Sequence, residues 1–411
     1  MIRHIIRMVW NRKRSTSLLL VELLVSFLVL CVVFSAGAYY VDNWRKPLGF
    51  DYHDVLTLVA VSPPVDDSQA EVRARRLAEA GRLMDAIRSQ PEVEGVSPLA
   101  NTPYSGSMSR RGMNLKDGAM VQFMVSDVTP GLASVLRFSV VNGRWLDDSD
   151  AGAAWTSVVV TRRLATRLFG RDDPIGRTID SYDDNGTLQV AEREADVMKI
   201  VGVIDDYRKA GEFSDSPYAA FMPMHPNDPE RSFPAQEYLV RVAPGTPAAF
   251  EEKLLRLLQG VTPEYSLRLT PLSTTRSDYI RGTLLPLIIL AIVAGFLILM
   301  VGMGLVGVLW QNVSQRSREF GLRRALGATG GDIQGQVLGE MLALTTLAML
   351  IGSILFLQIP MLKLPGFITL KTSLAAIAGS MLVLYPFVSL CSLYPSWLAS
   401  GVQPVEALQH E

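Results

Sequence analysis

The stretch "VGMGLVGVLWQNVSQRSREFGLRRALGATGG", Val301 to Gly331, changes from an apolar run into a run rich in arginine. Its glycines Gly302, Gly304 and Gly307 have the G-x-G-x-x-G spacing of a dinucleotide-binding loop. That fingerprint requires a strand before the glycines and a helix after them. Here they lie inside the apolar segment Leu284–Trp310, which is too long and continuous for a strand, a turn and a helix. We therefore interpret the glycines as packing positions of a membrane helix and expect no cofactor.

The distribution of apolar residues decides the fold class. The 411 residues are 49% hydrophobic, with a mean hydropathy of +0.23. A membrane-spanning helix needs about 20 mostly apolar residues, and the stretches that qualify are Leu18–Tyr40, Leu284–Trp310, Val337–Ile359 and Leu374–Leu393. The long polar part Val41–Arg281 lies between the first and the second. The sequence predicts an α-helical membrane protein with four transmembrane helices (1+3) and a large α+β extracytoplasmic domain inserted between the first two.

Charge and cysteine content exclude several classes of function. A net charge of -1 argues against a nucleic-acid partner, which would require a basic face. Cys31 and Cys391 both lie in apolar runs, and the 4 histidines form no zinc-binding pattern. We expect no metal and no nucleic-acid site.

Positive charge close to helix ends marks the cytoplasmic side. Basic residues precede the first span and follow the second: Arg3, Arg7, Arg12, Lys13, Arg14, Arg316, Arg318, Arg323 and Arg324. The loop between the third and fourth spans has only Lys363 and Lys371 and is predicted outside. Both chain ends are then inside, and the polar middle is extracytoplasmic.

The first span has two interpretations. Basic residues, an apolar run and Ala36-x-Ala38 also describe a cleavable signal peptide, but the apolar core is longer than such peptides usually have. A retained anchor is favoured. Before it, Ile2, Ile5, Ile6 and Val9 recur at helical spacing, which indicates an amphipathic helix on the inner membrane surface. Glu22 would reach the interface or face a neighbouring helix.

Small residues in the spans predict close helix packing. They are Ala291, Gly295, Gly304 and Gly307 in the second span, and Gly335 and Gly339 in the third. A subunit interface and packing within one bundle are equally open. Pro286 is expected in the first turn of its helix, where proline is harmless, and Pro386 within its span. The carboxyl-terminal spans have no central charge, which disfavours proton-driven transport.

The cytoplasmic stretch Asn312–Glu340 is read as a helix with arginines on one side and apolar contacts at Val313, Phe320, Leu322 and Leu326. Gly327 and the pair Gly330–Gly331 are expected to stop it before a new helix begins. An alternative is that its arginines only bind anionic lipid.

The order N-x-x-x-R-x-R-E-x-G-x-R-R-A-L-G-A, followed by a glutamate, resembles the MacB/FtsX-like permeases of ABC transporters. The matching residues are Asn312, Arg316, Arg318, Glu319, Gly321, Arg323, Arg324, Ala325, Leu326, Gly327, Ala328 and Glu340. The carboxyl end resembles the same family at Tyr394, Pro395, Ala399, Pro404, Val405, Glu406, Ala407 and Leu408. It departs from the family at Ser396, Trp397 and Ser400, where arginines are usual.

The resemblance implies a non-catalytic subunit of the bacterial inner membrane whose coupling helix, Asn312 to Ala328, docks on a separate ABC ATPase. The sequence contains no G-x-x-x-x-G-K-[ST] phosphate-binding motif. A second permease chain, identical or related, is implied, with helix packing or dimer contacts at Gly295, Gly304, Gly307, Gly335, Gly339 and Glu340. The family's functions are efflux with a periplasmic adaptor and outer-membrane channel, extraction of lipoprotein or lipid, or regulation of a cell-wall hydrolase without transport.

The polar middle is predicted to contain two strand-helix-strand units. The first is strand Asp54–Val61 and helix Ser68–Gln90, followed by "VEGVSPLA"; the second is strand Glu237–Ala243, helix Pro247–Gln259 and strand Tyr265–Thr270. We expect them to form one α+β layer near the membrane, with Tyr104–Pro234 as an inserted, mainly β lobe. Segments of this lobe resemble the family's periplasmic core domain.

Paired carboxylates in the lobe do not predict an acid–base site. Asp205–Asp206 and Asp183–Asp184 are explained more simply by a strand end and a turn. Asn185-Gly186 is a hairpin signal, and Asp180–Gly186 lacks the spacing of a calcium loop.

The predicted boundaries follow the chain: inner-surface helix 1–14, transmembrane helix 15–40, outer domain 41–281 (layer 54–103 and 237–272, lobe 104–236), transmembrane helix 282–310, coupling helix 311–335, transmembrane helix 336–360, outer loop 361–372, transmembrane helix 373–395 and tail 396–411.

Overall fold

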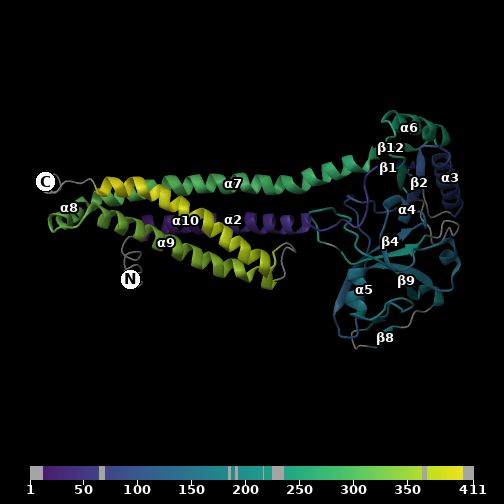
Figure 1. The fold of residues 1–411 in the computed structure, drawn as a ribbon, viewed down its shortest axis with the longest axis horizontal. Coiled ribbons are helices and arrows are strands. Elements are labelled where there is room, and N and C mark those ends of the chain that lie inside the picture. Colours follow the sequence, from purple (N-terminus) through teal and green to yellow (C-terminus); the bar gives the residue numbers. More distant parts are fainter. Residues whose placement is uncertain are drawn as a thin grey trace. The chain divides into compact units, whose positions relative to one another are not determined.

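The computed structural model describes residues 13–63, 70–183, 187–189, 193–215, 217–224, 236–362 and 368–400. The chain divides into two compact units, one from Met1–Asp42 and Thr283–Glu411, the other from Asn43–Gly282 (Figure 1). The expected inner-surface helix before Lys13, the Asn185-Gly186 turn and the motif residues from Pro404 onward lie outside the described residues.

The first unit is a bundle of long apolar helices (Figure 1). They are α2 (Lys13–Trp44), α7 (Leu272–Gln315), α9 (Gly330–Gln358) and α10 (Leu370–Ser400), joined in part by the short helices α8 (Ser317–Ala325) and η3 (Pro360–Leu362). Each of the four contains one predicted span, and by length and composition all 4 could cross a membrane. The four-helix prediction is confirmed.

Two apolar clusters hold the bundle together. One joins Leu19 and Leu23 of α2 to Leu305 of α7, Val337 of α9 and Val388 of α10. The other is built around Phe27 and Cys31 of α2, with Met349 and Phe356 of α9 and Leu384 of α10. Because all four helices contribute to the first cluster, the chain forms a bundle rather than separate hairpins.

One local prediction about the second span is wrong. Pro286 was expected in the first turn of its helix, but α7 begins at Leu272 and Pro286 lies inside it. The helix starts early because the polar segment before the span, from Leu272 to Gly282, is itself helical.

The second unit contains a four-stranded sheet in the order β12-β1-β11-β2. Its strands are β1 (Val55–Val61), β2 (Val93–Pro98), β11 (Glu237–Val242) and β12 (Ser266–Pro271), and all of its pairs are antiparallel. Helices α3 (Ala70–Arg88) and α6 (Ala249–Val261) pack on it through Leu83, Ile87, Leu254 and Leu258. Strands from the two ends of the domain thus form one layer.

A six-stranded mixed sheet, in the order β3-β4-β10-β6-β9-β5, makes up the rest of this unit. Its elements are β3 (Arg110–Asn114), β4 (Met120–Val128), α4 (Leu132–Leu136), β5 (Val140–Gly143), η1 (Asp148–Gly152), β6 (Thr156–Thr161), α5 (Arg162–Phe169), η2 (Glu194–Asp196), β9 (Met198–Ile204) and β10 (Ala219–Pro223). A short antiparallel pair, β7 (Ser181–Tyr182) and β8 (Leu188–Gln189), completes it.

An aromatic cluster lies between the two sheets of this unit. Phe138, Tyr207 and Phe221 contact one another with ring centroids 5.2–5.5 Å apart. Leu239 of the four-stranded sheet and Leu272 at the start of α7 belong to the same core. The start of α7 is therefore part of the hydrophobic core of the outer unit.

Candidate functional site

The most connected polar group in the helical unit is Arg316, between α7 and α8. Its Nε and Nη2 atoms donate to the Glu319 carboxylate at 2.9 and 3.1 Å. Its Nη1 atom donates to both oxygens of Glu340 on α9, at 3.1 and 3.0 Å. These hydrogen bonds raise the pKa of Arg316. One guanidinium therefore joins the end of α7, the start of α8 and the first turns of α9.

Neighbouring groups extend this network. Arg323 donates to Glu319 at 2.7 Å and to Gln336, and Gln336 donates to Glu340 at 3.1 Å. We call Arg316, Glu319, Arg323, Gln336 and Glu340 the cytoplasmic lock. The sequence assigned Arg316, Glu319 and Arg323 to docking on a partner. In the structure these side chains form hydrogen bonds within the chain.

The end of α8 presents an apolar surface instead. The side chains of Leu322 and Leu326, one helical turn apart, are 57% and 80% exposed, whereas Val313 is buried. Gly321 is buried. The side chains of Asn312, Arg318, Phe320 and Arg324 lie outside the described set. The sequence grouped Leu322 and Leu326 with Val313 as apolar contacts, and Leu326 also with the coupling residues; exposure distinguishes the two leucines from Val313.

The turn after α8 differs from the expectation. Gly327 does stop the helix, with a φ of 101° that favours glycine, and Ala328 follows it. Gly330 and Gly331 were expected to stop the helix as well, but they form the first turn of α9. Thr329 and Asp332 form a reciprocal capping box that starts the new helix there.

The packing glycines fall into two groups. A β-carbon on Gly304 would stand 2.8 Å from Oε2 of Glu22, so α2 and α7 approach closely there. Among the described residues, nothing lies within 4 Å of a β-carbon position on Gly295, Gly307, Gly335 or Gly339. Glu340, grouped with them from the sequence, is a member of the cytoplasmic lock.

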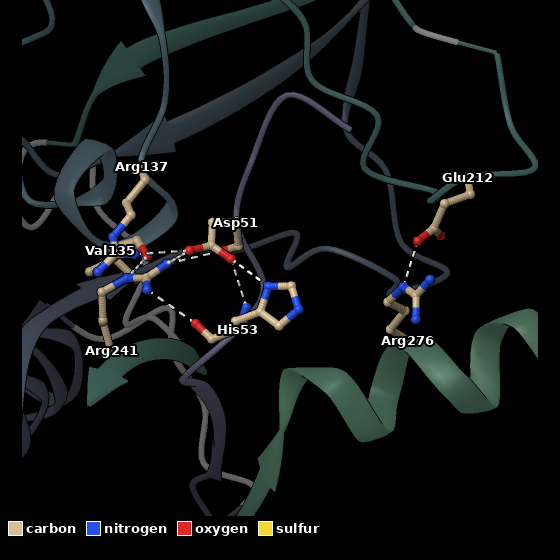
Figure 2. Close-up of polar contacts among 7 residues, drawn as sticks. All are labelled: Asp51, His53, Val135, Arg137, Glu212, Arg241 and Arg276. Carbon is tan, nitrogen blue, oxygen red and sulfur yellow. Dashed lines mark hydrogen bonds and ion pairs between the residues drawn. The ribbon is translucent and has the colours of Figure 1, made fainter. Parts of the chain in front are cut away.

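In the outer unit, the loop between β9 and β10 joins the two chain segments that connect this unit to helices α2 and α7. Arg208, which is fully buried, donates to the carbonyl of Lys46 just after α2, at 2.9 Å. It also donates to the carbonyls of Glu212 and Ser214 in its own loop, at 2.7 and 2.6 Å. The carboxylate of Glu212 accepts from Arg276 in the first turns of α7, at 2.5 Å (Figure 2). We call Arg208, Glu212 and Arg276 the base clamp.

Lys209, the next residue of that loop, holds a second loop. Its Nζ donates to the carbonyl and the hydroxyl of Ser105, at 3.1 and 2.9 Å, and to the carbonyl of Ser107. Burial lowers the pKa of Lys209 to about 8, against the opposing effect of Glu237.

A second ion-pair cluster fixes the entry of the chain into β1 (Figure 2). Arg241 on β11, 2% exposed, donates to the carbonyls of Val135, His53 and Asp51, at 2.6, 3.1 and 3.1 Å. Asp51 pairs with Arg137 at 3.2 Å and accepts from His53. Although burial opposes it, these hydrogen bonds and the charge of Arg241 lower the pKa of Asp51.

Sequence reasoning missed both clusters because each of them joins segments that lie far apart in the chain. The available signal was a basic residue a few positions after an apolar strand, as with Arg208 after "IVGVIDDY". Two of the carboxylates that it considered have partners within the outer unit: Asp205 pairs with Arg162 at 3.2 Å, and Asp206 accepts from the backbone of Tyr207. Within the described ranges, no group of three potential metal ligands occurs.

Two known families match adjacent parts of this chain. The MacB-like periplasmic core domain matches residues 25–257, and the FtsX-like permease C-terminal domain matches residues 291–404.

Curated relatives match most of the chain. The pyoverdine export ATP-binding/permease protein PvdT of Pseudomonas aeruginosa is 25% identical over 98% of this chain and 57% of its own length. The macrolide export ATP-binding/permease protein MacB 2 of Aeromonas hydrophila is 27% identical over 80% of this chain and 48% of its own. The chain thus spans about half the length of these two relatives. The uncharacterized ABC transporter permease YknZ of Bacillus subtilis is 23% identical, over 84% of this chain and 83% of its own.

Solved structures are similar to part of this chain. The periplasmic region of MacB from Actinobacillus actinomycetemcomitans has a TM-score of 0.38 at 14% identity, covering 58% of this chain and 97% of that one. The extracellular domain of YknZ has a TM-score of 0.32 at 15% identity, and the match covers 52% of this chain and 99% of that one.

Proposed function

The chain belongs to the MacB/FtsX-type family of ABC transporter permeases, and we propose that it couples ATP hydrolysis by a separate ATPase chain to movement of its own outer domain. The proposal also draws on YknZ, a relative named as an ABC transporter permease, which matches this chain over 83% of its own length. The working unit would be two permease chains with two ATPases, in the bacterial inner membrane.

The cytoplasmic lock is the observation that carries the proposal. A partner that displaces α8 must also move α7 and α9, because Arg316 is hydrogen-bonded to Glu319 and Glu340 at once. Arg316 and Glu340 are only 19% and 22% exposed, so water screens their attraction less than at an open surface. Because of these contacts, α8 would move together with α7 and α9 rather than separately from them.

The docking surface itself would be apolar, with charge around it. Leu322 and Leu326 are exposed beside Arg323. Interfaces obtain affinity chiefly from buried apolar anchors, while charges at the rim set register and rate. We assign the anchor role to the two leucines and the orienting role to Arg323.

On the outer side, the base clamp would receive the motion. Helices α2 and α7 flank the outer domain in sequence, and Arg208 and Arg276 attach the segments next to them to one loop. A displacement of either helix would thereby be transmitted to the β9–β10 loop and the sheet that it belongs to.

Export is the transport mode that we favour, since PvdT and MacB are export proteins by name. Release of a lipoprotein or lipid, or activation of a cell-wall hydrolase, are the competing outcomes. Accumulation of a small compound in cells that lack the chain supports export; loss of hydrolase activation without accumulation contradicts it.

The coupling role is tested with the double variant Leu322→Asp, Leu326→Asp. It should insert into the membrane but no longer co-purify with the ATPase or stimulate it. Leu257→Asp, at an exposed leucine of α6 in the outer unit, is the matched control and should retain both. Robust ATP hydrolysis by the purified chain alone would contradict the two-chain scheme.

The membrane orientation has a separate test. Reporter fusions at Ser107 and at Thr329 should report opposite sides of the membrane. The same side for both would remove the basis for placing α8 against an ATPase.

A further inference from the structure

The lobe around the six-stranded sheet contains a cavity that the proposed transport function does not use. Its volume is about 310 Å³, near the lower end of the roughly 300–1,000 Å³ range of small-molecule sites. Three segments form it: the β3–β4 turn, the end of α5 and the segment from Thr178 to Tyr182.

The floor of the cavity is apolar. Met113 and Ile179 are 5% and 7% exposed and belong to the core of the lobe. The half-buried side chains of Leu115, Leu168 and Phe169 complete the floor. A bound molecule would therefore meet a fixed apolar surface.

The walls are held by backbone hydrogen bonds. In the β3–β4 turn, Leu115 donates to Ala119, and Ala119 donates to the carboxylate of Asp117, at 2.9 and 3.0 Å. Opposite, Ile179 donates to the carbonyl of Met198 on β9 at 2.9 Å. A preformed site of this kind loses little entropy on binding.

The polar groups of the cavity are incompletely paired. The guanidinium of Arg167, at the end of α5, is 36% exposed, and its nearest carboxylate oxygen, on Asp117, is 3.9 Å away. That distance is beyond hydrogen bonding. Across the described part of the chain, Arg167 has no hydrogen-bond acceptor, and neither Lys116 nor Asp180 has a polar partner. An arginine fork without an acceptor, in a pocket wall, matches a carboxylate in both geometry and charge.

We propose that this cavity binds a small molecule with a carboxylate next to an apolar side chain, as in an apolar amino acid or the free carboxyl end of a short peptide. Arg167 and Lys116 hold the carboxylate, the apolar floor takes the side chain, and Asp180 accepts from an ammonium group where the ligand has one. The outer domain then has a binding site for a small molecule. This inference is independent of the transport proposal.

The test is calorimetric titration of the full chain in lipid nanodiscs. The probes are phenylalanine, glycyl-phenylalanine, N-acetylphenylalanine, which lacks the ammonium, and phenylalaninamide, which lacks the carboxylate. We expect saturable binding of carboxylate-bearing probes and at least tenfold weaker binding of phenylalaninamide. If glycyl-phenylalanine binds and phenylalanine does not, the site takes the carboxyl end of a peptide. If both bind, the site recognises the carboxylate and apolar side chain that the two probes have in common.

Arg167→Gln should weaken binding at least tenfold. Arg162→Gln, on the same helix but paired with Asp205 outside the cavity, should bind like the unaltered chain. Leu115→Trp, which fills the cavity from the turn, should also lose binding. Thermal unfolding of all three variants confirms that they fold. Equal affinity of Arg167→Gln and Arg162→Gln, equal affinity for phenylalanine and its amide, or no saturable binding at millimolar concentration would each overturn the proposal.

Discussion

The Nη1 atom of Arg208 donates a hydrogen bond to the backbone carbonyl of Lys46, with 2.9 Å between the two heavy atoms. The two residues are far apart in sequence, and this contact closes the outer unit between the end of α2 and the β9–β10 loop. Arg208→Gln removes the guanidinium that donates to the carbonyls of Lys46, Glu212 and Ser214, so we expect a loss of about 3 kcal/mol in the free energy of unfolding.

Two further variants separate packing from charge at this position. Arg208→Lys keeps the charge but not the planar guanidinium, so its free energy of unfolding should lie between those of the Arg208→Gln variant and the unaltered chain. Arg162→Gln removes only an exposed ion pair and should cost less than about 1 kcal/mol. Thermal unfolding of the full chain in detergent measures all three; equal stability of the Arg208→Gln and Arg162→Gln variants contradicts a structural clamp.

The elements that the sequence predicted well are those with a strong local pattern. Four apolar runs of spanning length became α2, α7, α9 and α10, because each run alone satisfies the requirement of a bilayer. Pro286 was misplaced because the first turns of α7, from Leu272 to Gly282, are polar and do not belong to the apolar run. Gly330 and Gly331 were misread because the capping of α9 by Thr329 outweighs the low helix propensity of glycine.

The candidate site was only half predictable. The motif identified Arg316, Glu319 and Arg323, but a pattern cannot show that Arg316 contacts Glu340 across 24 residues. The base clamp could not be predicted, because Arg276 of α7 and the segment at Lys46 meet the β9–β10 loop only in the folded chain. Contacts between residues far apart in the chain depend on how the whole chain packs, so the pattern of a single sequence does not predict them.

Close packing of α2 on α9 should make Gly352 sensitive to substitution. A β-carbon there would stand 2.5 Å from Cδ1 of Phe27, a fully buried ring, and 3.2 Å from Leu24. Gly352→Ala should cost about 1–3 kcal/mol through overpacking. Gly339→Ala, in the same helix but in open space, should be neutral or slightly stabilising. Unfolding of the two variants in detergent compares them directly.

The same open glycines test self-association. If Gly335 and Gly339 face a second permease chain, Gly339→Leu should weaken dimer formation at least tenfold while the monomer unfolds as before. Cross-linking yield against chain concentration in nanodiscs gives the measurement. An unchanged dimer assigns these glycines to a lipid-facing surface.

The cytoplasmic lock should behave as a coupled pair. Arg316→Gln and Glu340→Gln each leave the other partner incompletely paired. The double variant should therefore lose less free energy of unfolding than the two single variants lose in sum, with a coupling energy of about 1 kcal/mol or more. Arg281→Gln, on α7 at an exposed ion pair with 3.8 Å between Arg281 and Asp278, is the control and should be additive with Glu340→Gln. Additivity of the lock variants would mean that Arg316 and Glu340 do not hold α7 to α9.

Acid should weaken the outer unit through Asp150. Burial by itself would raise the pKa of this carboxyl, but hydrogen bonds from Arg144, Ser157 and the backbone of Asp147 outweigh it and lower the pKa to about 2. Because the folded value lies below the ordinary 3.8, the stabilisation is complete above about pH 4 and is lost as pH falls through 2. Asp150→Asn should cost about 2 kcal/mol at neutral pH and flatten the decline between pH 4 and 2. Asp148→Asn, at the exposed neighbour in η1, should leave both the stability and its pH dependence unchanged, and an identical acid profile for the two variants would show that Asp150 contributes nothing to it.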